Sequence, residues 1–287
     1  MVDTPRLNGI IGALESGRIA FSTFAPMDVV TAVSVSNSSY DGIVFEGEHL
    51  PWDGMALRDS LQFLLDRRDI VSRGSLAPQI TPFARVPVNG IEKSQWHAKQ
   101  ALDIGCYGIV WPHISTVEEA YNAVAACRYP RLKDKPLFEP QGIRGDGPVR
   151  AARYWGLTQQ QYYKKADVWP LDLQGEIFVI LQIEDIKGIE NLSDILGNVP
   201  GIGAILIGEG DLGQELGFPR QYDHPALLDA MSQIVDICIR HDTVVGHPHA
   251  NSSNMQNLID KGYRFLMAAS GRDYTNLNVG LELSGRL

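Results

Sequence analysis

The chain has 287 residues, of which 44% are hydrophobic and 21% are charged, and it carries a formal net charge of −9. This length is ample for one barrel domain, and the acidic balance argues against nucleic acid as a partner. The chain contains no run of about 18 apolar residues, so we expect no membrane-spanning helix. The N-terminus shows no signal-peptide pattern, and the odd number of widely spaced cysteines favours reduced thiols. We therefore expect a cytoplasmic protein.

Short apolar runs alternate with helical patterns along the chain, and runs of this kind indicate buried parallel strands. The predicted strands are residues 19–24, 41–46, 80–86, 107–111, 177–183, 203–208, 243–247 and 264–269. Eight strands alternating with helices predict an α/β fold, a (β/α)8 TIM barrel that spans residues 1–287 as a single domain. An open doubly wound sheet is the alternative, but no Gly-x-Gly-x-x-Gly follows the first strand.

The clearest helical patterns cover residues 52–67, 116–127 and 225–240. Apolar residues recur at helical spacing in the first and third of these. The second opens with a Ser115–Thr116 cap and has acidic residues in its first turn, which is the usual start of a helix.

One segment, residues 130–175, is longer than a simple connection between strands four and five requires. A polar, proline-rich stretch at 130–140 predicts a loop, and an aromatic, helix-like stretch follows it. Long loops in compact domains usually serve function, so we expect a lid or a subunit contact that borders the active site. The alternative is that the aromatic residues only pack the segment onto the barrel. These residues are Tyr154, Trp155, Tyr162 and Tyr163.

Two acidic residues close apolar runs. Residues 177–183 are followed by Glu184, and residues 202–207 are followed by the sequence Gly-Glu-Gly-Asp that ends at Asp211. Barrels place their chemistry at the carboxyl ends of their strands, and two carboxylates there could bind a hard divalent cation. The alternative for each carboxylate is that it caps the helix that follows.

Further chemistry follows other predicted strands, and it converges on the same end of the barrel. The residues are Glu46, Glu48, His49, Arg85 and Gln182. Taken alone, the histidine could be a structural hydrogen bonder and the arginine a surface ion-pair partner. Together with Glu184 and Asp211, they provide oxygen ligands, a base near neutral pH and a fixed cation. This set suits removal of a proton beside a carbonyl and stabilisation of the resulting enolate.

Six short motifs occur in the order found in the HpcH/HpaI aldolases, and the resemblance runs from about Gly12 to Gly285. The motifs are Gly47-Glu-His49, Arg85-Val-Pro, Leu102-Asp-Ile-Gly105, Gly142-Ile-Arg-Gly145, Gln182-Ile-Glu184 and Gly208-x-x-Asp-Leu212. The chain thus resembles a class II, metal-dependent pyruvate aldolase. The resemblance implies a barrel of the phosphoenolpyruvate/pyruvate-binding type with Mg²⁺, Mn²⁺ or Co²⁺, and a homo-oligomer, usually a hexamer with exchanged C-terminal helices.

The resemblance also implies roles for individual residues. Glu184 and Asp211 correspond to metal ligands, His49 to the catalytic base and Arg85 to the residue that steadies charge on the keto oxygen. The pyruvate-binding positions correspond to Gln182, Gly210 and the backbone of Asp211. Asp103 corresponds to the residue that raises the basicity of the histidine. Because Asp103 ends a predicted barrel helix, it could reach that histidine only across a subunit interface, and capping of the turn at Gly105 is its alternative role.

The implied reaction is cleavage of a 4-hydroxy-2-oxo acid to pyruvate and an aldehyde, both small molecules. No lysine closes a predicted strand, which argues against a Schiff-base mechanism. The chain departs from the family at Glu46, where aspartate is usual, and at Glu209 and Gly213, which replace a proline and a serine. Glu209 is thus expected to add a carboxylate near the metal. Two other functions therefore stay open: a CoA-ester lyase of the citrate lyase or malyl-CoA type, and a catalytically silent metabolite-binding barrel.

Overall fold

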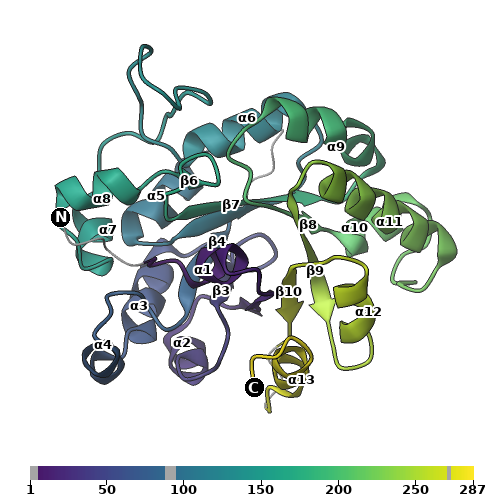
Figure 1. Ribbon diagram of the computed structural model, residues 1–287, viewed down its shortest axis with the longest axis horizontal. Helices are drawn as coiled ribbons and strands as arrows, with labels where there is room; N and C mark the ends of the chain where they lie inside the picture. Colours follow the sequence, from purple (N-terminus) through teal and green to yellow (C-terminus); the bar gives the residue numbers. More distant parts are fainter. Residues whose placement is uncertain (1–5, 88–94, 270–272) are drawn as a thin grey trace.

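The computed structural model describes residues 6–87, 95–269 and 273–287, so the expectation about the N-terminal segment lies partly outside the described residues. Its parallel strands form a nearly closed barrel with helices around it (Figure 1). The strands are β1 (Ala20–Ser22), β2 (Phe24–Ala25), β3 (Gly42–Glu46), β4 (Thr81–Arg85), β5 (Gly108–Trp111), β6 (Val168–Trp169), β7 (Ile177–Ile183), β8 (Ala204–Ile207), β9 (Val244–Ala250) and β10 (Phe265–Ala268).

The barrel closes through a first strand that is interrupted at Thr23. The strand order is β1-β10-β9-β8-β7-β5-β4-β3-β2, with β6 pairing β7 off this path. Thus β1 pairs with the last strand while β2, one residue further along the chain, pairs with β3. All eight predicted strands are confirmed, the first as β1 and β2 together, and β6 was not predicted.

Helix α1 (Gly9–Glu15) precedes the first strand and packs against the interior of the barrel, whereas the other helices lie around the outside (Figure 1). These other helices are α2 (Val29–Val35), α3 (Gly54–Leu64), α4 (Arg67–Arg73), α5 (Trp96–Ile104), α6 (Val117–Ala126), α7 (Val149–Tyr154), α8 (Gln159–Lys165), α9 (Ile186–Asn198), α10 (Glu209–Glu215), α11 (Pro225–Arg240), α12 (Met255–Asp260) and α13 (Thr275–Leu283). The capped start predicted for residues 116–127 is confirmed, because the Thr116 and Glu119 side chains form a reciprocal capping box.

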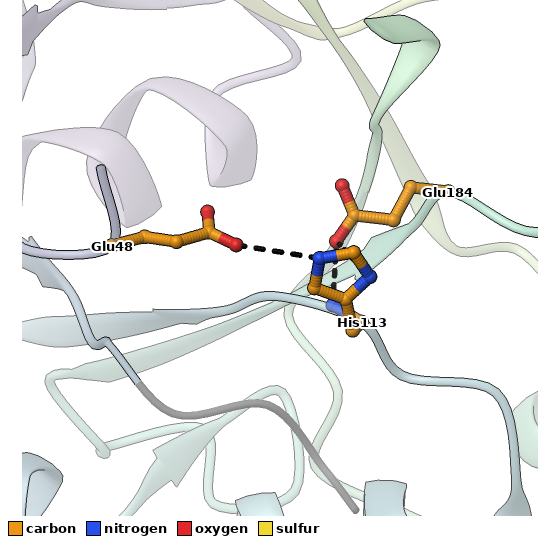
Figure 2. Close-up of side chains that lie close together, drawn as sticks. All are labelled: Glu48, His113 and Glu184. Atoms are coloured by element: carbon orange, nitrogen blue, oxygen red, sulfur yellow. Dashed lines mark hydrogen bonds and ion pairs between the residues drawn. The ribbon is translucent and has the colours of Figure 1, made fainter. Parts of the chain in front are cut away.

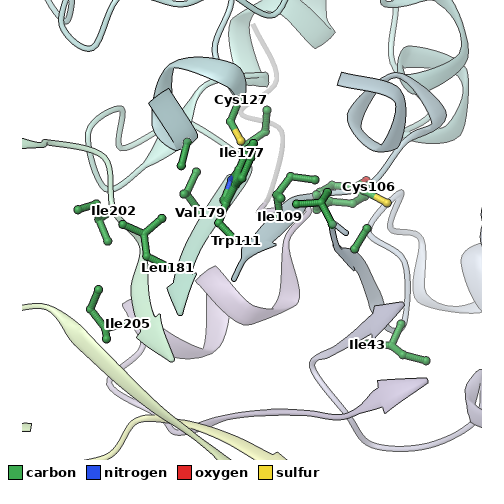
Figure 3. Packing of buried hydrophobic residues seen from close by; sticks show 14 of the residues in the cluster. Ile43, Cys106, Ile109, Trp111, Cys127, Ile177, Val179, Leu181, Ile202 and Ile205 are labelled. Atoms are coloured by element: carbon green, nitrogen blue, oxygen red, sulfur yellow. The ribbon is translucent and has the colours of Figure 1, made fainter. Parts of the chain in front are cut away.

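Alternate residues of the strands face two separate parts of the core. In β7, Phe178 and Ile180 point into the barrel, where Ile10 of α1 packs with them. Val179 and Leu181 point outward to the helices, in the layer shown in Figure 3. Because both faces of a barrel strand are buried, the strands read as continuous apolar runs, and this is why the sequence predicted them well.

Three of the four aromatic residues named in segment 130–175 are buried in the core, namely Tyr154, Trp155 and Tyr162, and Tyr163 is 40% exposed. The Trp155 ring stacks on Tyr107 with ring centroids 4.1 Å apart, and its Nε1 donates to the Gly105 carbonyl over 2.9 Å. The Tyr162 hydroxyl accepts from Arg144 over 2.6 Å. Both aromatic side chains are fully buried, so the expectation that this stretch forms a lid is wrong for them, and their role is to pack the segment onto the barrel.

The structure also bears on three other expectations, which concern the cysteines, membrane-spanning helices and the C-terminal helix. All three cysteines are free and buried. In the described ranges, no helix is long and apolar enough to cross a membrane. The C-terminal helix α13 packs on its own barrel through Leu277 and Leu281, and Arg286 beyond it pairs with Asp41 over 2.7 Å. The hexamer stays a prediction.

Candidate active site

The carboxyl ends of the strands surround a cavity of about 280 Å³. Six of the seven predicted site residues line it, and they come from the ends of β3, β4, β7 and β8. These residues are His49, Arg85, Gln182, Glu184, Gly210 and Asp211. Parallel strands bring their carboxyl ends to one face of a barrel, which explains why positions far apart in the sequence meet here.

Arg85, the last residue of β4, is the buried cation of the site and is 7% exposed. It pairs with Glu46, its register partner on β3. Its Nη1 lies 2.9 Å from Glu48 Oε2 and donates to Gln182 Oε1 over 3.3 Å. These contacts reject the alternative that Arg85 is a surface ion-pair residue, because each partner is itself largely buried and comes from the carboxyl end of another strand.

Glu46 also shapes the loop that follows β3. Its carboxylate accepts the backbone N–H groups of Glu48 and His49, over 2.7 and 3.3 Å. The same side chain thus fixes Arg85 and the turn that carries the predicted base. The His49 ring is 65% exposed and its Nε2 lies 3.6 Å from Glu48 Oε2.

Glu184 follows β7 and is only 1% exposed. One oxygen accepts the backbone N–H of His113 and the other accepts Gln182 Nε2, each over 2.6 Å. Burial raises the pKa of Glu184 to about 7, although the nearby His113 opposes the shift. A Cβ at Gly208 would lie 2.3 Å from the carboxylate, so only glycine fits beside it.

His113 is a site residue that the sequence analysis missed. Its ring lies between Glu48 and Glu184, with Nε2 3.5 Å from the first carboxylate and Nδ1 3.4 Å from the second (Figure 2). Its φ of 53° is unusual for a residue other than glycine, and such strain is common at functional sites. The available signal was its place two residues after β5, the same offset at which Glu48 follows β3.

The residues on this wall fit a divalent cation. One ligand atom each from Glu48, His113 and Glu184 lie within 4.8 Å of one another. Burial raises the pKa of Glu48 as well as that of Glu184, although Arg85 opposes the shift at Glu48 and His113 opposes it at both carboxyls. Asp211 lies outside this cluster but lines the same cavity from the first turn of α10. Carboxylate oxygens with one imidazole suit Mg²⁺, Mn²⁺ or Co²⁺.

Asp103 is the one predicted site residue that does not line this cavity. It lies near the end of α5, just before the chain enters β5, so it is at the opposite end of the strands. Its carboxylate accepts from Arg144 over 3.0 Å, and burial raises its pKa against the effect of that arginine. A role for Asp103 toward a histidine of another subunit stays a prediction.

A second carboxylate–histidine group, also missed from the sequence, lies on the wall formed by α10 and β9. Glu209 forms a short hydrogen bond with His249 and lies 3.3 Å from His247. Glu209 lines the same cavity as Glu184 and Asp211, and both of its oxygens face imidazole nitrogens. The pair His247-Pro-His249 at the end of a predicted strand was the available signal.

The cavity at the strand ends, with its buried arginine and carboxylates, is that of a barrel enzyme. The profile of the family described as HpcH/HpaI aldolase/citrate lyase matches residues 22–276, so the chain belongs to this family. It is 27% identical over 264 residues to the hydroxypyruvate/pyruvate aldolase of Roseobacter denitrificans, which covers 92% of this chain and 91% of the relative. The 4-hydroxy-2-oxovalerate aldolase of Rhodococcus jostii is 30% identical over 79% of this chain and 78% of the relative.

The fold is also similar to that of a solved structure. A crystal structure of an HpcH/HpaI aldolase/citrate lyase family protein from Burkholderia cenocepacia superposes with a TM-score of 0.75 at 23% identity, over 96% of this chain and 97% of that chain. The named relatives are aldolases, so this chain is an enzyme of a family of carbon–carbon lyases.

Proposed function

We propose that the protein is a divalent-metal-dependent aldol lyase that reversibly cleaves a 4-hydroxy-2-oxo acid to pyruvate and an aldehyde. The observation that carries the proposal is the joint placement of Arg85, Glu184 and His49 around one cavity. A buried cation, a buried carboxylate that favours a metal ion and an exposed imidazole are what enolate chemistry requires. The relatives named above, which are aldolases acting on pyruvate or on a hydroxy-oxo acid, support the same reaction.

Glu184 and Asp211 are the proposed metal ligands, with His113 and Glu48 close enough to Glu184 to assist. A bound Mg²⁺, Mn²⁺ or Co²⁺ would supply Lewis-acid polarisation of the keto group and would neutralise the excess carboxylate charge.

The chain's own residues perform the other tasks. His49 removes a C3 proton from pyruvate, and its exposed ring is free to do so. Arg85 steadies the negative charge that develops on the keto oxygen, because its guanidinium is held in place by Glu46 and Gln182. Substrate carboxylate binds at the start of α10, where the N–H groups of Gly210 and Asp211 have no partner within the helix. A Cβ at Gly210 would meet nothing within 4 Å, which leaves this approach open.

A lysine Schiff base would be the other route to the same bond. Within the described residues, the cavity lining includes Arg85 and Arg220 but no lysine. This lining favours the metal-dependent route.

A CoA-ester lyase is the second candidate, because the family description includes citrate lyase. It would need cations for the CoA phosphates, and among the described lining residues Arg220 is the exposed arginine, whereas Arg85 is buried and paired. Assembly as a homo-hexamer and a cytoplasmic location belong to the proposal as well, and size measurement in solution tests the first of these.

The test is a lactate dehydrogenase-coupled assay for pyruvate, run on a panel of 4-hydroxy-2-oxo acids. We expect pyruvate release that EDTA abolishes and that Mg²⁺, Mn²⁺ or Co²⁺ restores. Full activity in EDTA would reject the metal-dependent route. Release of free CoA from acyl-CoA substrates, with no pyruvate from the panel, would favour the second candidate, and no turnover of either class would indicate a silent barrel.

A further inference from the structure

The group formed by Glu209, His247 and His249 has a defined hydrogen-bond pattern. His249 Nδ1 bonds one oxygen of the Glu209 carboxylate, and His247 Nε2 lies 3.3 Å from the other oxygen. The backbone N–H of His249 donates to His247 Nδ1 over 3.1 Å. An imidazole nitrogen that accepts a hydrogen bond carries no proton, so the proton of a neutral His247 is on Nε2, which faces Glu209.

Burial lowers the pKa of His247 to about 4, so this ring is neutral near pH 7. Its Nε2 then presents a proton toward Glu209 across 3.3 Å, and Glu209 bonds directly with His249. Because the proton of His249 is on the Nδ1 atom that faces Glu209, its Nε2 keeps a free lone pair. A buried carboxylate that orients an imidazole in this way is how enzymes hold an acid–base histidine.

The three side chains differ sharply in exposure. Glu209 and His247 are each 5% exposed, whereas the His249 side chain is 60% exposed and lines the cavity together with Glu184 and Asp211. If the group served only to tie α10 to β9, the contact between Glu209 and His247 would be enough. The exposed ring of His249 is the member of the group that a substrate can reach.

His249 also stands between two cavities. A second cavity of about 630 Å³ shares Glu209, Tyr222 and His249 with the first and continues toward α11 and α12. The first cavity contains the residues proposed to bind pyruvate. The position of His249 is therefore the boundary between the pyruvate part of a substrate and the space available for the rest of it.

We propose that His249 is the acid–base residue for the oxygen on C4 of the substrate, with Glu209 and His247 as positioning residues. This inference rests on the proposed function. In cleavage, His249 Nε2 takes the proton of the C4 hydroxyl, and the O–H electron pair forms the aldehyde C=O bond. The electron pair of the breaking C3–C4 bond passes into the C2–C3 enolate. In the reverse direction, the imidazolium returns the proton to the C4 alkoxide. His49 serves the C3 proton alone, so the chain divides the two proton transfers between two histidines.

The experiment measures both half-reactions on the metal-loaded enzyme. Exchange of the pyruvate C3 protons for deuterium, followed by NMR, reports enolisation, and pyruvate release from a 4-hydroxy-2-oxo acid reports cleavage. In His249→Ala we expect release to fall by about 100-fold or more, the usual scale of acid–base catalysis, while exchange continues. Added imidazole should restore part of the release. His249→Gln, with a polar side chain that preserves more of the local packing, repeats the test.

Two further variants complete the design. His241→Ala is the matched control, because His241 bonds Ser193 outside the cavity and should leave both rates unchanged. Glu209→Gln keeps the shape of the positioning residue, so we expect a lower kcat for release with little change in KM and no rescue by imidazole.

The inference is overturned if His249→Ala releases pyruvate at the parent rate, if exchange and release fall in equal proportion, or if imidazole rescues nothing. A parent-like kcat in Glu209→Gln would reject the positioning role. A parent enzyme that neither exchanges pyruvate protons nor releases pyruvate would instead reject the proposed function, so the two failures are distinct.

Discussion

The two carboxylate–histidine groups of the cavity use the same residue types in opposite ratios. In the first, Glu48 and Glu184 flank the single ring of His113, and the pKa values of both carboxyls are raised (Figure 2). In the second, one carboxylate, Glu209, is bonded by two rings. In the first group Glu48 is paired with Arg85, but among the described residues Glu184 has only His113 as an ion-pair partner, so this group suits a metal ion. In the second group, each oxygen of the carboxylate faces a ring of the group itself. The comparison teaches that the ratio of carboxylates to imidazoles, and their burial, decide what a cluster can bind.

The strongest test of this comparison is the Glu184→Gln variant. Removing the buried carboxylate should abolish cleavage and weaken Mn²⁺ binding by more than about 100-fold, beyond what the loss of an outer-shell partner costs. Calorimetric titration with Mn²⁺ measures the affinity. Glu190→Gln, on the exposed face of α9, is the control and should bind as the parent does. Parent-like affinity in Glu184→Gln would remove the metal site from this wall.

His49→Ala tests the base proposed for the first half-reaction. We expect pyruvate C3 proton exchange to slow by about 100-fold or more, with Mn²⁺ affinity unchanged, because His49 lies outside the cluster of Glu48, His113 and Glu184. Deuterium exchange followed by NMR gives the rate. If exchange continues at the parent rate, the base lies elsewhere.

The burial of Glu184 in the first group also predicts a pH dependence of the metal-free protein. The pKa of Glu184, about 7, lies above the ordinary carboxyl value, so between pH 5 and 7 the folded state holds a proton that the unfolded state has lost. Stability therefore falls as pH rises through this window, by an amount on the order of 3 kcal/mol.

Thermal denaturation in EDTA at several pH values measures this slope. Glu184→Gln should flatten it, and saturating Mn²⁺ should do the same, because the cation favours the ionised carboxylate. An equal slope in the parent and in the variant would assign the titration to another group.

A smaller effect on Mn²⁺ affinity is expected from replacing His113, whose ring lies between the two carboxylates of the first group. His113→Ala should reduce Mn²⁺ affinity by about 10- to 100-fold, the usual cost of losing a supporting residue at a metal site. His249→Ala, in the second group, should leave the affinity unchanged. Titration of both variants side by side would contradict the comparison if their affinities fell together.

The smallest functional effect is expected at Trp155, in the aromatic stretch that the structure places in the core. Trp155→Phe loses the hydrogen bond to the buried Gly105 carbonyl, so it should cost about 1–3 kcal/mol of stability. The ranking of aldehydes in the addition direction should stay that of the parent. A changed ranking of aldehydes at unchanged stability would indicate that this segment borders the part of the active site that binds the aldehyde.

The sequence was enough to predict the barrel and several of the side chains that line its cavity. Buried strands read as apolar runs, and the residues just after them must meet at one face of a barrel, so Arg85, Gln182 and Glu184 could be assembled without coordinates. The caps and the apolar spacing of the helices are local properties, which is why the start of α6 was predicted to within one residue.

Only the tertiary structure decided which side chains face each other. His113 and His249 each follow a proline just past or within a strand end, and sequence spacing does not reveal that their rings turn toward Glu184 and Glu209. For the same reason, Glu209 was expected at the metal. Burial of Trp155 depends on Tyr107, a residue of another segment. Periodicity along one chain encodes which face of an element is buried. Partners across the cavity are set by packing between elements, and that packing also decides how many carboxylates and imidazoles meet in each group.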